Sequence, residues 1–147
     1  MMRHIGPIMV ATDLTLEGEG ITDVAVELAR ALDAGLLVVH VLTEQEISDR
    51  AEALPPESSY VDMIRDRRRD DVLAELKRAA DGTRVAGEVE VVMGEPARQV
   101  IKIATERDCR MIVLGVRQRS RVGKLLLGSV AQEVLLSAPC PVVAVRS

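Results

Sequence analysis

Short apolar runs alternate along this chain with segments that carry apolar residues at helical spacing. Most of the runs are continuous, which is typical of strands buried on both faces of a parallel sheet. The runs that predict strands are residues 8–11, 36–41, 85–93, 111–114 and 142–145. The third run partly alternates with polar residues such as Glu88 and Glu90, so we expect this strand toward an exposed edge of the sheet.

Four segments between these runs predict amphipathic helices. The first follows Thr22 as a candidate N-cap and stops near Gly35, and the second covers about residues 61–80. The third has Pro96 at its first helical position, where proline is favoured. The fourth begins at Ser129, which has a glutamine three residues later and therefore the spacing of a capping box.

The alternation of strands and helices predicts an α/β fold. Parallel strands need crossover connections, and right-handed crossovers place helices against the sheet, so we expect an open, doubly wound, five-stranded parallel sheet with helices on both faces. No repeat or linker is visible, and residues 1–147 are expected to form a single domain. Segment 43–59 has no long apolar stripe, which predicts a mobile excursion between a strand and a helix.

Composition narrows the functional classes. The chain has 147 residues, of which 48% are hydrophobic, and a formal net charge of −4, which favours one globular core over a basic nucleic-acid or membrane-surface binder. Tyr60 is the single aromatic residue, so the sequence has no set of rings for stacking bases. Residues 65–71 together with Asp62 balance four arginines with four aspartates, which predicts a solvated helix face with local ion pairs.

The cysteines and histidines give no sign of a metal site or a nucleophile. Cys109 and Cys140 form no CxxC pair and have no neighbouring histidine, so we expect buried free thiols and a reducing compartment. His4 and His40 lie far from each other and from ligand-spaced partners, and His40 is expected to be an ordinary strand residue. No apolar run approaches membrane-spanning length, and we expect a soluble, cytoplasmic protein without an export signal.

Candidate chemistry gathers where strands end, because ligands of open α/β sheets bind beyond the carboxyl ends of the strands. Thr12 and Asp13 follow the first run. A glycine-containing loop follows the fourth run and leads to Gly128 and Ser129, and residues 109–132 hold five basic side chains and no acid. Such a loop before a helix N-terminus suits a phosphate group, although its spacing alone is equally consistent with a solvated basic loop.

This loop is neither a Walker P-loop nor a dinucleotide fingerprint. Gly123-Lys124 is followed by Leu125, and no glycine stands at the required upstream position. The first strand leads to Asp13 without a GxGxxG motif. A typical NAD or FAD site is therefore not expected.

The whole chain resembles the universal stress protein family, whose small α/β domains are related to nucleotide-binding folds of the adenine nucleotide alpha hydrolase type. The segments that carry the resemblance are residues 10–13, 39–41, 94–97, the glycine loop and 138–145. ATP-binding members carry glycine, two residues, glycine, nine residues, and then glycine with serine or threonine. This chain has Gly115, then Gln118 in place of the second glycine, then Gly128-Ser129.

The resemblance implies a nucleotide site in which Asp13 and the backbone of Val41 hold the adenosine, while the Gly115 loop and Gly128-Ser129 hold the phosphates. Gln118 adds a side chain where the family pattern has none, but its amide can bond a phosphate or a ribose, and Arg117 adds charge. The candidate binding residues are Thr12, Asp13, Val41, Gly115, Arg117, Gln118, Gly128, Ser129 and Val130.

We therefore expect a regulatory domain that binds ATP or another adenine nucleotide, with or without Mg²⁺, and hydrolyses it slowly at most. The resemblance implies a homodimer through the last strand, and the regulatory partner is unknown. One alternative is a nucleotide-free dimeric interaction module that has lost the ligand through Gln118. Another is an enzyme that adenylates or pyrophosphorolyses a substrate, as relatives of this fold do.

Overall fold

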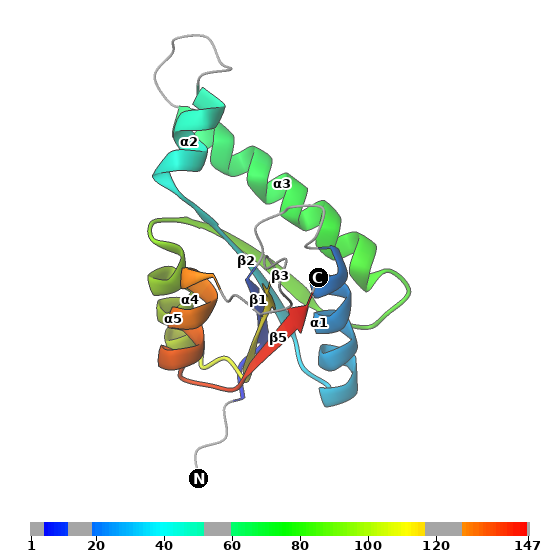
Figure 1. Ribbon diagram of the computed structural model, residues 1–147. Coiled ribbons are helices and arrows are strands. Elements are labelled where there is room, and N and C mark those ends of the chain that lie inside the picture. The colour runs from blue at the N-terminus through cyan, green and yellow to red at the C-terminus, as the bar shows by residue number, and fades with distance from the viewer. Residues whose placement is uncertain (1–4, 12–18, 52–59, 117–127, 147) are drawn as a thin grey trace.

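A five-stranded parallel sheet forms the centre of the protein (Figure 1). The computed structural model describes residues 5–11, 19–51, 60–116 and 128–146. The sheet has the order β3-β2-β1-β4-β5, so the predicted fold class is confirmed, and β3 is an edge strand as expected. The strands are β1 (Ile8–Ala11), β2 (Leu36–Leu42), β3 (Gly87–Met93), β4 (Met111–Val116) and β5 (Val142–Arg146).

Helices cover both faces of this sheet (Figure 1). The helices are α1 (Glu19–Leu32), α2 (Glu44–Ala51), α3 (Tyr60–Ala80), α4 (Pro96–Glu106) and α5 (Ser129–Ser137). Residues of α4 and α5 pack with one face of the sheet in one apolar cluster, and residues of α1 and α3 pack with the other face in a second cluster. No helix in the described part of the chain is long and apolar enough to cross a membrane.

The central strand explains why the apolar runs are continuous. Ile8, Met9 and Val10 of β1 are each 0% exposed, because β1 has a strand on either side and helices on both faces. Its last residue, Ala11, is in register with Val39 of β2 and Leu114 of β4. Alternate residues of β1 therefore enter different clusters, and every position of the strand needs an apolar side chain.

Two helix starts differ from the prediction. Thr22 is not an N-cap, because α1 already begins at Glu19, and Thr22 is fully buried in the stripe that faces the sheet. Its hydroxyl has no hydrogen-bond partner in the part of the chain that the structure describes. The capping box at Ser129 is also wrong, because Gly128 is the N-cap of α5 and Ser129 is its first helical residue.

Segment 43–59 also differs from the prediction, because its first part is helix α2. No described side chain of α2 is buried, so the helix has no apolar stripe that a sequence pattern could reveal. The hydroxyl of Thr43 accepts a hydrogen bond from the Glu46 amide at 3.1 Å and caps the helix. Residues 52–59 lie outside the described part of the chain.

The ion pairs expected along α3 are present. Arg65 lies 3.9 Å from Asp62, and Arg68 lies 3.4 Å from Asp71, each pair with the i,i+3 spacing of a helix surface. The aspartates of both pairs are exposed, and ion pairs at the surface contribute little stability individually.

Both cysteines are free, and Cys109 belongs to the core between α4 and β4. Burial raises the pKa of the Cys109 thiol to about 11, with a smaller contribution from the nearby Cys140. Burial also raises the pKa of Cys140, and Asp108 adds to that shift. The thiolate is the reactive form, so the raised pKa values disfavour either cysteine as a nucleophile near neutral pH. Cys140 is half-buried and not buried as expected.

We predict that Cys109 in the native protein reacts with iodoacetamide at pH 7.5 on the order of 100-fold more slowly than in the unfolded chain, because its thiolate is depleted and its side chain is buried. Labelling followed by peptide mass spectrometry, with and without urea, measures this ratio. The half-buried Cys140 serves as the internal comparison and is expected to react faster than Cys109. Equal rates for Cys109 in the native and unfolded protein would contradict its burial.

Candidate functional site

The carboxyl ends of all five strands lie along one edge of the sheet, and the chain reverses its winding direction between β1 and β4. Open α/β sheets bind ligands at the strand ends beside such a reversal, so the ends of β1 and β4 are the expected place for a ligand. The segments after β1 and β4, residues 12–18 and 117–127, lie outside the described part of the chain. Thr12, Asp13, Arg117 and Gln118 therefore remain predictions from the sequence.

The N-terminus of α5 is the described feature of this edge that is best suited to an anion. Gly128, the N-cap, has an extended backbone with φ −62° and ψ 159°, and no side chain of the described residues caps the first turn. A Cβ atom built at Gly128 would meet no atom of the described residues within 4 Å. Neither backbone strain nor packing against the described residues requires glycine here, and a glycine at this position lets an anion approach the helix amides closely.

Two other helices that begin at this edge use their own side chains as caps. The Glu95 carboxylate accepts hydrogen bonds from the amides of Ala97 and Arg98, at 3.2 and 2.9 Å, at the start of α4. Thr43 caps α2 through its contact with Glu46. Two first-turn amides of α4 and one of α2 are thus engaged by side chains, whereas no side chain of the described residues engages those of α5.

The first turn of α5 is exposed, but the helix is anchored behind it. Ser129 and Val130 lie on the surface, with Val130 40% exposed. Ala131 and Val134 are buried in the cluster that α5 shares with α4 and the sheet. The amides and the Ser129 hydroxyl are therefore held on a rigid element, as a binding site requires.

Val41 lies on the same face of the sheet as α5. Its side chain is half-buried and packs against the cluster that contains Ala131 of α5. Because side chains alternate along β2, the neighbouring His40 points to the opposite face, toward α3. The structure thus places Val41, near the end of β2, and Gly128–Val130, at the start of α5, on the same side of the sheet.

Gly115 faces the opposite side of the sheet, the side covered by α1. A Cβ atom there would overlap Cδ1 of Ile21, so the close approach of α1 to β4 accounts for this glycine by packing alone. A ligand on the α5 side could use only its backbone. The role of Gly115 in phosphate binding remains a prediction.

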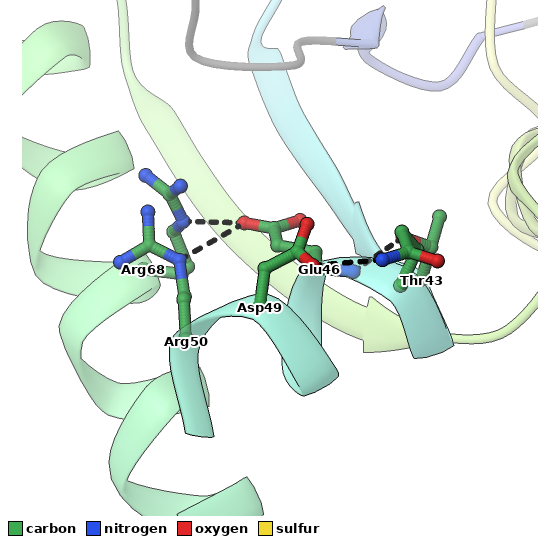
Figure 2. Close-up of a pocket in the computed structure, with 6 residues that line it drawn as sticks. Thr43, Glu46, Asp49, Arg50 and Arg68 are labelled. Atoms are coloured by element: carbon green, nitrogen blue, oxygen red, sulfur yellow. Dashed lines mark hydrogen bonds and ion pairs between the residues drawn. The ribbon is translucent and has the colours of Figure 1, made fainter. Parts of the chain in front are cut away.

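A second feature of this edge is a cavity between α2 and α3, with a volume of about 470 Å³ (Figure 2). Glu46 is at its centre. One carboxylate oxygen of Glu46 accepts a hydrogen bond from Arg68 Nε at 2.6 Å and lies 3.6 Å from Arg50 Nε. The other oxygen lies 3.0 Å from Nε2 of His40, which is 3% exposed. The cavity is lined by Thr43, Gln45, Glu46, Asp49, Arg50 and Arg68.

The sequence analysis missed this cluster. His40 was expected to be an ordinary strand residue, and Arg68 to pair only along its own helix, but both contact Glu46 of α2. Glu46 and Arg68 are 22 residues apart, and no pattern in the sequence links them. Among the described residues, no group of three histidine, cysteine or acidic side chains is arranged to hold a metal ion.

Comparison with known proteins agrees with this architecture. The model of the Universal stress protein family matches residues 4–146. A universal stress protein of Mycolicibacterium smegmatis is 33% identical over 130 residues, which cover 88% of this chain and 88% of the relative. The structure of a universal stress protein from Archaeoglobus fulgidus superimposes with a TM-score of 0.65 at 28% identity, covering 95% of this chain and 97% of that one.

A universal stress protein from Archaeoglobus fulgidus is also known in complex with dAMP. That structure matches this one with a TM-score of 0.59 and 25% identity, over 95% of this chain and 96% of the other. The family model thus covers nearly the whole chain, and the fold agrees with structures of its members. The resemblance seen in the sequence motifs is confirmed, and this chain belongs to the universal stress protein family.

Proposed function

We propose that this chain is a regulatory domain that binds an adenine nucleotide at the carboxyl edge of its sheet, with the phosphates at the N-terminus of α5. The observation that carries the proposal is the first turn of α5 behind Gly128, which no side chain of the described residues caps. Side chains do engage first-turn amides of α2 and α4. An N-terminus without a side-chain acceptor is a favourable site for a phosphate group.

The distribution of charge supports the same position. The chain is acidic overall, yet residues 109–132 carry five basic side chains and no acid. Arg110 is used elsewhere, because it donates a hydrogen bond to the Leu32 carbonyl at the end of α1. The other four basic residues belong to segment 117–127, which leads directly to α5. Long-range attraction would therefore concentrate anions beside the open helix terminus.

The adenosine is proposed to lie against Val41 and beside Asp13, as the family resemblance implies. The half-buried Val41 supplies apolar surface on the face that carries α5. The dAMP complex of the Archaeoglobus fulgidus protein supports an adenine nucleotide as the ligand class. ATP is the nucleotide we favour, because the family resemblance implies that the Gly115 loop and Gly128-Ser129 hold phosphates, and Mg²⁺ would bind those phosphates if it is present.

The described groups at this edge favour binding over catalysis. The amides of α5, the Ser129 hydroxyl and the apolar side chain of Val41 can hold a phosphate and a base. None of these groups is a base that activates water, so we propose hydrolysis that is slow at most.

We also propose that the protein is a homodimer through β5. Within the described part of the chain, β5 pairs with β4 alone and ends the sheet. Three of its five residues, Val142, Val143 and Val145, are half-buried valines. An edge strand with unpaired backbone groups readily pairs with the same strand of a second copy.

Saturating ATP with Mg²⁺ is expected to raise the melting temperature. At a concentration about 100 times Kd, ligand binding adds about 2.7 kcal/mol of stability, which is roughly 5–10 °C for a domain of this size. Differential scanning fluorimetry measures the shift, and CTP at equal concentration tests recognition of the base. A folded sample that shows no shift with millimolar ATP would favour the nucleotide-free interaction module instead. Mass spectrometry of gently purified protein detects any retained nucleotide.

Substitution Gly128→Val is expected to weaken ATP binding by about 10–100-fold, because the added side chain separates a phosphate from the α5 amides. The protein should still fold, since the backbone of Gly128 is extended and a Cβ atom there meets no described atom within 4 Å, but it is expected to lose about 1 kcal/mol of stability because valine is a poorer N-cap than glycine. Isothermal titration calorimetry measures the affinity. Ser137→Val places the same bulk at the exposed opposite end of α5 and is the control. Equal affinity for both variants would place the phosphates elsewhere.

In solution, the protein is expected to have twice the 16.0 kDa mass of one chain. Size-exclusion chromatography with light scattering measures this mass directly. A monomer at micromolar concentration would contradict the proposed dimer but not nucleotide binding, because the two proposals depend on different surfaces.

A further inference from the structure

The cavity between α2 and α3 is separate from the proposed nucleotide site. Arg68 belongs to α3, which packs on the face of the sheet opposite to α4 and α5. The cavity is nevertheless at the carboxyl edge, since Thr43 directly follows β2. The cavity thus combines a place at the edge where the strands end with two arginine side chains, Arg50 and Arg68.

Two guanidinium groups meet at one carboxylate in this cavity. Arg68 and Arg50 both approach the same Glu46 oxygen through Nε, at 2.6 and 3.6 Å. Their terminal nitrogens are consequently directed away from Glu46, and Figure 2 shows those of both residues on the same side. Of these nitrogens, only Nη1 of Arg68 has a hydrogen-bond partner in the described chain, which is Asp71 at 3.4 Å.

Partial burial of Arg68 strengthens any hydrogen bond that its remaining donor can make. The side chain of Arg68 is 15% exposed and that of Glu46 is 21% exposed, so the arrangement is only partly screened by water. Glu46 and Asp71 together balance the two guanidinium charges, so what remains for another acceptor is the terminal N–H groups of Arg50 and Nη2 of Arg68, which have no hydrogen-bond partner among the described residues. The planar fork of arginine matches the oxygens of a phosphate or carboxylate group.

We propose that Arg50 and Arg68 bind the oxyanion of a phosphate group in the cavity between α2 and α3. With Glu46, Asp49 and Asp71 set against the two arginines, the cluster has no net positive charge, and Asp49 accepts a hydrogen bond from the Gln45 amide at 2.7 Å. Binding therefore depends on directed N–H groups more than on net charge. That favours a group with several oxygens on one centre, such as phosphate, over a simple halide.

A phosphate in this position would clamp α2 against α3. Arg50 belongs to α2 and Arg68 to α3, so one bound group would bridge the two helices. No described side chain of α2 is buried, and Glu46 joins the helix to His40 of β2 and Arg68 of α3. A weakly attached helix gains protection from a ligand that binds only its attached form. The ligand would thereby control the position of α2.

Titration of inorganic phosphate into the full-length protein tests the proposal. We expect shifts of the backbone amide signals of α2 and of the Arg68 region in ¹H–¹⁵N NMR spectra, together with slower hydrogen exchange in α2. Sodium chloride at matched ionic strength should not reproduce these changes. Glucose 6-phosphate, titrated in parallel, distinguishes a phosphate monoester from free phosphate as the better ligand.

Arg50→Gln is expected to weaken phosphate binding at least fivefold at this cavity. The side chain of Arg50 is 37% exposed, and its Nε lies 3.6 Å from Glu46, which is too far for a strong hydrogen bond. Its replacement should therefore leave the fold intact. Arg69→Gln on the exposed side of α3 makes the same change in charge and should have no effect. The proposal is overturned if neither phosphate compound shifts α2, if sodium chloride gives the same shifts, or if both variants lose binding equally. Shifts confined to the start of α5 would likewise overturn it, while leaving the proposed nucleotide site intact.

Discussion

Burial of β1 on both faces is the constraint on which the rest of the structure depends. A strand with Ile8, Met9 and Val10 fully inaccessible needs a neighbour at each edge and helices above and below. The flanking strands β2 and β4 run parallel to it, so each connection crosses over the sheet. All carboxyl ends then meet at one edge, and the reversal between β1 and β4 marks the expected place for a ligand there.

At this edge of the sheet, side chains of the protein can occupy the helix amides that a ligand would otherwise bind. The residue at each cap position therefore decides whether the amides of that helix are engaged. Glu95 supplies a carboxylate to α4, in the manner in which a bound phosphate would be held. Thr43 does the same more weakly for α2. At α5 the cap position is a glycine without a side chain, and no side chain of the described residues engages the first-turn amides. The start of a helix thus serves stability in α2 and α4, and at α5 it is the place where we propose that a phosphate binds.

Glu46 shows how a polar residue can attach a helix that has no apolar face. It is shared by a buried histidine of β2 and by arginines of α2 and α3. Partial burial strengthens these interactions relative to those on the exposed side of α3. The same arrangement orients two guanidinium groups toward a common cavity (Figure 2). The attachment of α2 and the proposed phosphate site therefore have one structural origin.

The sequence by itself determined the parallel strands, the amphipathic helices, the family and the candidate loop, because burial leaves a periodic pattern within each segment. Only the tertiary structure decided that α1 begins before Thr22, that α2 is a helix, and that Ile21 accounts for Gly115. It also brought Glu46 to Arg68 across 22 residues. Contacts between separate segments depend on how the helices pack on the sheet, and a local pattern of apolar and polar positions carries no record of that packing.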